Sequence, residues 1–307
     1  MKKTFCMVLV FISLLGAGCS KADNSIQASA PETSTEYRIY FAGSYLSELQ
    51  ADAESSLNIS NSVHALPENC DFSFSYTTAP DDLDVPLQKS FAIDGKTHQL
   101  TYTCTSVASF ANSNNEALRH YGTVNAYKEE KYVFEFFQES GELSFYGNYE
   151  ADRTVAGDFT KEEVMIASEA ILAELFGNDC IEYYTVSPNV SELVDDRYNV
   201  FIVTYTKYIE GYPTNDQIQL RYNKQGELLS VNAKTYGLMK SVIDRYGVTQ
   251  LQSAEKFLTD YIDTIPYHDK DSVNLLINSD GKCYLEIYAS CKVGDNYRAN
   301  SFYVNLD

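Results

Sequence analysis

Thiols and imidazoles are the side chains of this sequence best suited to nucleophilic or metal chemistry. The chain has seven cysteines and four histidines, and Cys104 with His120 is one pair that offers a nucleophile and a base. However, no CxxC or HExxH motif occurs, and the histidines lack the spacing of metal ligands. We therefore predict no catalytic residue and no metal ligand among Cys70, Cys104, Cys180, Cys283, Cys291, His64, His98, His120 and His268.

Disulfide pairing is constrained by the cysteines that follow position 36. They are five in number, so at least one thiol has no partner within the chain. Cys283 and Cys291, expected on one strand, would be roughly 26 Å apart at 3.3 Å per residue, which is too far for a disulfide. We expect most of these thiols to lie in the core, and other pairings stay open.

Three short acidic runs suggest cation binding. "NSDGK" at 278–282 resembles part of a calcium loop, but it lacks the later bidentate acid, and it suits a turn between two strands. "DDLD" at 81–84 and "VDD" at 194–196 are typical of solvated loops. Because the sequence also has no glycine-rich phosphate or dinucleotide motif, we predict no cofactor.

The N-terminus has the pattern of a secretory signal. Lys2 and Lys3 precede an apolar run at 4–15 that is too short to span a bilayer comfortably. "GAGC" then resembles the bacterial lipobox, which predicts a signal peptide over 1–18 and a lipid on Cys19. Two acyl chains there would anchor the protein stably to the extracytoplasmic face of the bacterial cell membrane. Since Gly16 stands where an aliphatic residue is usual, ordinary cleavage near Ala17 stays the alternative.

Composition predicts a globular protein that does not bind nucleic acid. The 307 residues are 44% hydrophobic and 21% charged, with a formal net charge of −20. Such a charge repels phosphate backbones and anionic lipid headgroups. Residues 19–36 are small and polar, and we interpret them as a flexible tether that ends where globular structure begins, near Tyr37.

Two segments carry helix signals. Thr160 and Glu163 form a capping box at the start of a helix over 160–177, and Thr249 has the same place in a helix over 249–262. The apolar faces expected from the helical spacing are Val164, Ala167, Ile171 and Leu175 in the first helix, and Leu251, Ala254, Leu258 and Tyr261 in the second.

Strands with one polar face are also evident. Apolar and polar residues alternate over 217–222 and again over 228–236. A strand with one polar face belongs to a sheet that has water on one side, and such sheets are mostly antiparallel.

These elements recur at a similar spacing. Gly141 and Gly226 follow similar strand sequences and lie 85 residues apart, while the two predicted helices begin 89 residues apart. We predict an α+β fold of repeated units, each a helix packed on an antiparallel β-meander; chance similarity of short segments is the alternative. The predicted parts are a β-rich domain at 37–155, an α+β unit at 156–240 and a second, shortened α+β unit at 241–307.

Residues 204–231 resemble the PepSY-type domain of secreted peptidase propeptides and bacterial surface lipoproteins. The pattern is a strand, a Gly-x-Pro hairpin, an alternating strand, a polar turn with glycine, and a last strand. The matching positions are Gly211, Pro213, Ile218, Gly226 and Leu229. The resemblance implies a cystatin-like α+β fold and a domain that regulates peptidases or binds other extracellular proteins, and that is not an enzyme.

The hairpin "IEGYPTND" at 209–216 is the predicted partner-binding site. Gly211 and Pro213 suit a tight turn, and we expect a turn this short to leave the aromatic ring of Tyr212 exposed. An exposed ring beside Glu210 and Asp216 suits a protein contact. The alternative is a hairpin tip that packs on its own helix.

From these observations we predict a non-catalytic, lipid-anchored extracytoplasmic protein that binds a peptide or protein, or regulates a peptidase. A solute-binding or sensory lipoprotein is the first alternative, and a hydrolase with its site in 37–155 is the second. The 25 tyrosines suit either role in a binding protein, as sheet stabilisers or as contacts to a partner.

Overall fold

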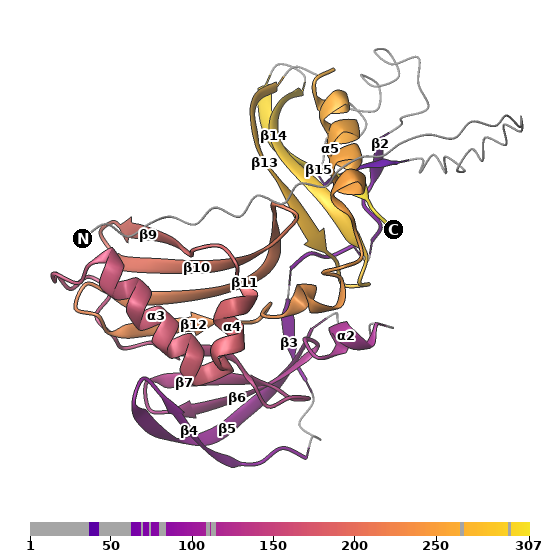
Figure 1. The fold of residues 1–307 in the computed structure, drawn as a ribbon. Coiled ribbons are helices and arrows are strands. Elements are labelled where there is room, and N and C mark those ends of the chain that lie inside the picture. The colour runs from indigo at the N-terminus through magenta and orange to yellow at the C-terminus, as the bar shows by residue number, and fades with distance from the viewer. Residues whose placement is uncertain are drawn as a thin grey trace, which may run out of the picture. The chain divides into compact units, whose positions relative to one another are not determined.

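Antiparallel hairpins make up most of the chain that the structure describes (Figure 1). This computed structural model describes residues 37–42, 63–68, 70–73, 75–79, 84–108, 111, 115–264, 267–293 and 296–307. The predicted signal peptide, Cys19, the tether and most of the "DDLD" run lie outside these residues.

Strands β3 to β8, before the first long helix, form a meander, whereas β1 and β2 pair with each other and belong to the C-terminal group of strands. β5 pairs with β6, β6 with β7 and β7 with β8, all antiparallel, and β4 folds back on β5. The bounds are β1 Ile39–Ala42, β2 Val63–Ala65, β3 Tyr76–Thr78, β4 Gln88–Ile93, β5 Lys96–Ala108, β6 Thr123–Glu129, β7 Tyr132–Phe137 and β8 Leu143–Asn148.

The later strands form two further antiparallel groups. β9, β10, β11 and β12 pair in order, and so do β13, β14 and β15. The bounds are β9 Asn189–Val194, β10 Asn199–Ile209, β11 Tyr212–Asn223, β12 Leu228–Asn232, β13 Tyr267–Ile277, β14 Cys283–Val293 and β15 Asn296–Asn305. The helices are α2 Glu116–Arg119, α3 Lys161–Phe176, α4 Asn178–Tyr183, the 3-10 helix η2 Leu238–Ser241 and α5 Val248–Ile262.

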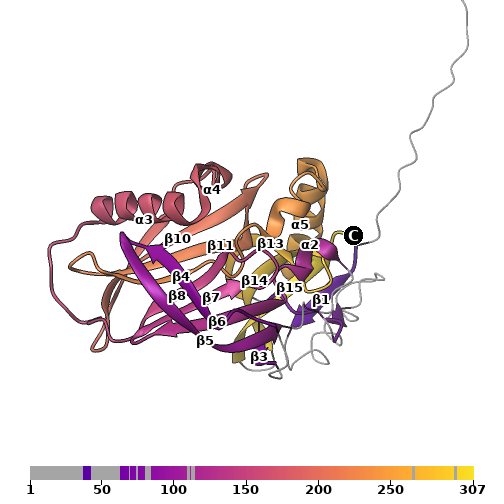
Figure 2. The same cartoon turned by 90° about the horizontal axis from the view of Figure 1, so that it is seen from below.

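The helix α3 begins where its sequence predicts. Thr160 is the N-cap, its hydroxyl accepts from the backbone N–H of Glu163, and the Glu163 carboxylate accepts from the backbone N–H of Thr160. This capping box satisfies donors that the first helical turn leaves unpaired. Gly177 ends the helix with φ 79°. The buried side of α3 packs on β10, and Figure 2 shows the helix lying along β10 and β11.

The helix α5 buries the predicted face but begins earlier than predicted. Gly247 is its N-cap, with no side-chain cap, so the prediction of Thr249 as the cap is wrong. The N-cap Gly247 has extended φ and ψ, so the first turn already includes Val248 and Thr249. The helix packs on β14 and β15 (Figure 1). The predicted residues Leu251, Ala254, Leu258 and Tyr261 are all buried.

None of the helices in the described part of the chain combines the length and the apolar character that a bilayer crossing requires.

Two buried clusters hold these elements together. The central core, under α3, joins Phe134 of β7 to Leu172 of the helix and Leu220 of β11. The C-terminal core, under α5, joins Ile39 of β1 to Leu258 of the helix and to β13–β15. Each core therefore combines strands from the N-terminal region with a later helix.

The prediction of a cystatin-like α+β fold of repeated helix-on-meander units is wrong, because the described chain is mostly β. The described strands form one mixed sheet of 15 strands, in which β12 pairs with β8, β15 pairs with β1, and β11 meets β13 in parallel at Thr214 and Leu275. An isolated meander would leave the backbone donors and acceptors of its outer strands unpaired. Here, strands that are distant in the sequence supply hydrogen-bond partners for these outer strands. The local alternation of residues cannot reveal which distant strand will pair.

Asn215 strengthens the contact between β11 and β13. Its side-chain amide donates to the carbonyl oxygen of Ile277 at 3.0 Å and accepts from the Ile277 N–H at 3.1 Å. The side-chain amide thus makes the two hydrogen bonds that a backbone peptide group would make in a strand pair.

Candidate functional site

One face of β8, β10, β11 and β12 is not covered by α3 and is named the open face here. Along β11, Ile218, Leu220 and Tyr222 are buried in the central core, on the side of α3. The residues between them, Gln219 and Arg221, therefore point to the opposite side, where the strand is half-buried or exposed. The polar side that alternation predicts is thus confirmed.

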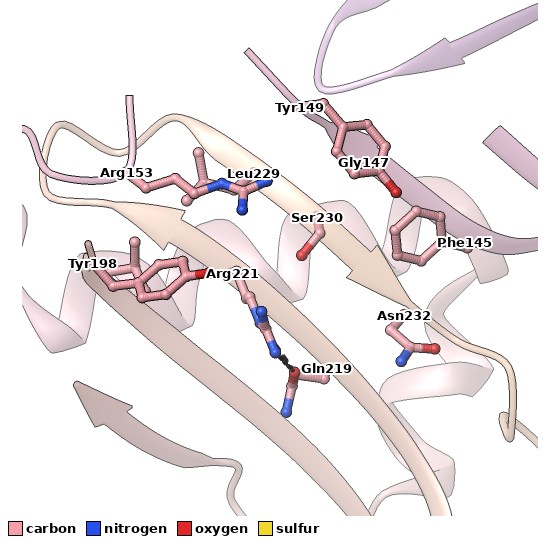
Figure 3. Close-up of a pocket in the computed structure, with 11 residues that line it drawn as sticks. Phe145, Gly147, Tyr149, Arg153, Tyr198, Gln219, Arg221, Leu229, Ser230 and Asn232 are labelled. Carbon is pink, nitrogen blue, oxygen red and sulfur yellow. Dashed lines mark hydrogen bonds between the residues drawn. The ribbon is translucent and has the colours of Figure 1, made fainter. Parts of the chain in front are cut away.

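The first hollow lies in the open face where two small residues meet. Arg221 pairs in register with Ser230 of β12, and Ser230 pairs with Gly147 of β8. Since strands lie about 4.8 Å apart, Arg221 and Gly147 are about 10 Å apart with only a small side chain between them. The hollow has a volume of about 230 Å³. Figure 3 shows Ser230 between Arg221 on one side and Phe145 with Tyr149 on the other.

Gly147 allows the aromatic side of the first hollow to form. A Cβ at this position would lie 2.9 Å from Cε1 of Phe145 and 3.3 Å from Cε2 of Tyr149. Both rings therefore lie against the glycine, and any larger residue would displace them. Tyr149 is 59% exposed, which is unusual for a large aromatic side chain in this protein.

The other side of the first hollow is cationic. Arg221 donates through Nε and Nη2 to Oε1 of Gln219, at 3.2 and 3.0 Å, which holds its guanidinium in place. Arg153 comes from the loop after β8, and its carbonyl oxygen accepts from the backbone N–H of Asn199 at 2.6 Å. Across the described chain, neither guanidinium has a carboxylate within 4.0 Å. Tyr198 lies beside Arg221 in Figure 3.

A second hollow of about 460 Å³ continues from the first one toward β13. Gln219 and Asn232 line both hollows, so the two are contiguous. The cation of the second hollow is Lys234, whose Nζ is 2.8 Å from Glu135 Oε2 and lies over the ring of Phe145 at 5.5 Å. Its charge is therefore neutralised, in contrast to the charges of the two arginines.

The predicted binding hairpin has its turn at the expected place. Glu210 and Gly211 form the tip, with φ values of 51° and 90°, and both are exposed. Pro213 is half-buried. Tyr212, in contrast, is only 8% exposed and belongs to the C-terminal core, and its hydroxyl donates to Glu255 of α5 at 2.5 Å. The prediction of an exposed aromatic on this tip is wrong.

Asp216 is also inside the protein, with no exposed surface. Its carboxylate accepts hydrogen bonds from the hydroxyls of Tyr183 and Tyr184, at 2.6 and 3.0 Å. It also accepts from the backbone N–H groups of Gly237 and Met239, at 3.1 and 2.9 Å. Burial raises the pKa of this carboxyl, and the four donors oppose that effect. Asp216 therefore stabilises the chain around η2 and is not available to a partner.

Two of the four described thiols have the environment of core residues. Cys180 and Cys283 are buried, and burial raises the pKa of each to about 11, which disfavours the thiolate. Cys70 and Cys104 are half-buried, and these four thiols are not in disulfides. Cys283 and Cys291 lie on the single strand β14, as predicted. The side chain of Cys291 lies outside the described residues.

The three histidines whose side chains are described, His64, His98 and His120, are not gathered into one site. His98 is buried, with Nδ1 2.6 Å from Glu129 Oε2, and His64 lies against the ring of Tyr40. The side chain of His268 lies outside the described residues. No group of three potential metal ligands occurs in the part of the chain that is described.

His120 lines a separate hollow with Glu142, Tyr236 and Lys240. Its Nε2 is 3.7 Å from Glu142, and Lys240 Nζ is 3.4 Å from the Tyr236 hydroxyl. These groups pair with one another. Burial lowers the pKa of His120 and raises that of the nearby Cys180 thiol, so this hollow lacks an activated thiol beside the base. No hydrogen bond joins Cys104 to His120 among the described residues.

The run at 278–282 is a turn between two strands, as predicted, and 194–196 is exposed at the end of β9, in agreement with a solvated loop. In 278–282, Oδ1 of Asn278 accepts from the backbone N–H groups of Asp280 and Lys282, between β13 and β14. In 194–196, Oδ1 of Asp195 accepts from two backbone N–H groups of the next turn.

Comparison of the chain with models of known protein families and with curated proteins gives no match. The assignment of a binding site to the open face therefore rests on geometry alone. Its strand residues could be found from the sequence, because Gln219 and Arg221 belong to the predicted polar side of 217–222. Arg153, Gly147 and Tyr149 carry no comparable signal, since they join the site only through the pairing of β8 with β12.

Proposed function

We propose that the protein binds a peptide segment of a partner on the open face, without catalysing a reaction. The observation that carries this proposal is the first hollow, which Arg153 and Arg221, without a carboxylate within 4.0 Å among the described residues, line together with the rings of Phe145 and Tyr149. Arginine and tyrosine are the residue types most enriched where binding energy concentrates in protein interfaces.

The site is preorganised, which favours binding. Gln219 fixes the Arg221 guanidinium, and the rings of Phe145 and Tyr149 rest on Gly147. Side chains already held in position lose little conformational freedom when a partner docks. The hairpin at 209–216 is replaced as the proposed contact, because Tyr212 and Asp216 are buried.

A soluble small ligand is less well supported. The two contiguous hollows, of about 230 and 460 Å³, follow β11 for about 20 Å along the sheet surface, whereas small-molecule sites are clefts or cavities that bury most of their ligand. Both hollows lie on a sheet surface and follow β11, which suits an extended chain that runs along this strand. This favours a peptide over the solute of a transport or sensory lipoprotein.

The proposed location follows from the N-terminal sequence. A lipid on Cys19 would hold the binding module at the extracytoplasmic face of the membrane, on the tether 19–36. From there, the open face can capture a segment of a secreted or surface protein. Regulation of a peptidase is one role of such capture, and it is the role that the PepSY resemblance suggests.

A photo-cross-linking experiment tests the proposed face. A photoreactive phenylalanine analogue replaces either Tyr149 in the open face or Ile166 on α3, which is 69% exposed on the opposite side. Peptides selected from a random displayed library by the purified protein are then irradiated with each variant. We expect cross-links from position 149 only. Failure to select any peptide, or cross-links only from position 166, would contradict the proposal.

A further inference from the structure

We infer that the ligand is an extended acidic peptide with one carboxylate in the first hollow and neutral residues in the second. This inference rests on the proposed function and specifies its ligand class. It assigns the guanidinium groups of Arg153 and Arg221 to the carboxylate.

Hydrogen-bond donors dominate the surface where the two hollows meet. Oε1 of Gln219 is occupied by Arg221, and Oδ1 of Asn232 accepts from the backbone N–H of Lys234. The amide nitrogens of Gln219 and Asn232 have no acceptor among the described residues. With the two guanidinium groups, they form a surface rich in donors, which the acceptors of a ligand can pair with. Carboxylates and peptide carbonyls supply them.

Charge places the carboxylate in the first hollow and not in the second. The protein has a formal net charge of −20, yet the two arginines of the first hollow have no carboxylate within 4.0 Å in the described chain. A carboxylate there gains two charge-assisted contacts. In the second hollow, Glu135 already neutralises Lys234, so a second acidic residue would meet no free cation. We therefore expect neutral residues at that end.

The length of the groove sets the length of the peptide. The two hollows follow β11 from Arg221 to Asn215, which is six residues or about 20 Å at 3.3 Å per residue. An extended peptide of about six residues spans this distance. Its side chains alternate in direction, so that about half of them face the sheet.

The test uses two synthetic, fluorescein-labelled hexapeptide libraries with capped ends. One has glutamate fixed at the first position, the other has glutamine there, and the remaining positions hold equal mixtures of neutral residues. Binding is measured by fluorescence anisotropy with the wild-type protein and with Arg153→Gln, Arg221→Gln and Asn232→Asp. Lys256→Gln, an exposed cation on α5 that lines neither hollow, is the matched control.

We expect the glutamate library to bind at least tenfold more tightly than the glutamine library to the wild-type protein. Each arginine variant and Asn232→Asp should remove most of that preference, whereas Lys256→Gln should keep it. The preference should also fall as salt is added, because it is electrostatic. Circular dichroism of each variant verifies that the substitutions leave the fold intact.

Other outcomes separate failure of the inference from failure of the proposed function. Equal binding of the two libraries that competes with the selected peptides would leave peptide binding standing and overturn the carboxylate assignment. Binding of oligogalacturonate, with neither library bound, would assign the arginines to an acidic glycan and overturn both. Binding of no probe at the open face would also overturn both.

Discussion

Asp216 is the buried group through which the packing around η2 can be tested most directly. Each carboxylate oxygen accepts one tyrosine hydroxyl and one backbone N–H: Oδ1 from Tyr184 and Gly237, and Oδ2 from Tyr183 and Met239. Replacement by asparagine keeps the shape but turns one acceptor oxygen into a donor. A tyrosine hydroxyl can rotate to accept a hydrogen bond, whereas a backbone N–H cannot.

The free-energy cost of Asp216→Asn follows from these contacts. One buried N–H loses its acceptor, which costs about 1–3 kcal/mol, and the remaining bonds lose the strength that the charge gives them, about 1 kcal/mol each. Easier burial of a neutral amide offsets part of this loss. We therefore expect the free energy of unfolding to fall by about 2–4 kcal/mol.

Urea denaturation followed by circular dichroism measures this change, with a constant slope showing that the unfolded state is unaffected. Tyr184→Phe, which removes one donor to Asp216, should cost less, about 1–2 kcal/mol. Glu210→Gln, in the exposed tip of the same hairpin, is the control and should change the stability by less than about 0.5 kcal/mol. If Asp216→Asn is as stable as Glu210→Gln, the assignment of Asp216 to a structural network is wrong.

Two further predictions concern Glu129 and Cys19. Hydrogen bonds from the backbone N–H of Gln99, at 2.7 Å, and from His98 hold the pKa of Glu129 below its usual 4.5. The charged carboxylate therefore stabilises the folded state above that pH, and this contribution is lost as the pH falls through the folded-state pKa. Glu129→Gln should therefore melt earlier than wild type at neutral pH and equally in strong acid; a difference that persists in acid contradicts this account. Cys19→Ala should abolish incorporation of a labelled fatty acid in a bacterial host, and unchanged labelling would refute the lipid anchor.

Local elements of this fold follow from the sequence because their causes are local. The start of α3 depends on Thr160 and Glu163, three residues apart, and the buried face of α5 depends on spacings of three and four residues. Both are visible in one short window. The true N-cap of α5 was missed because Gly247 makes no side-chain contact that a motif search can detect.

The burial of Tyr212 was within reach of the sequence. In β11, the buried residues Ile218, Leu220 and Tyr222 alternate with polar ones, and continuing that alternation backward places Asp216 and Tyr212 on the same buried side. The prediction failed because it treated 209–216 as a separate turn. The strand instead begins directly after the tip, at Tyr212, and without a break in its alternation.

The first hollow, in contrast, depends on long-range register. Alternation puts Arg221 on the open face, but the hollow exists only because Ser230 lies opposite Gly147, and these two strands are about eighty residues apart in the chain. Many strands of similar composition could pair with β12 at the place that β8 occupies. A slip of β8 by one residue would bring Tyr146 to the open face in place of Gly147, and its ring would fill the hollow. The proposed site is thus a property of one register, which only the assembled sheet can specify.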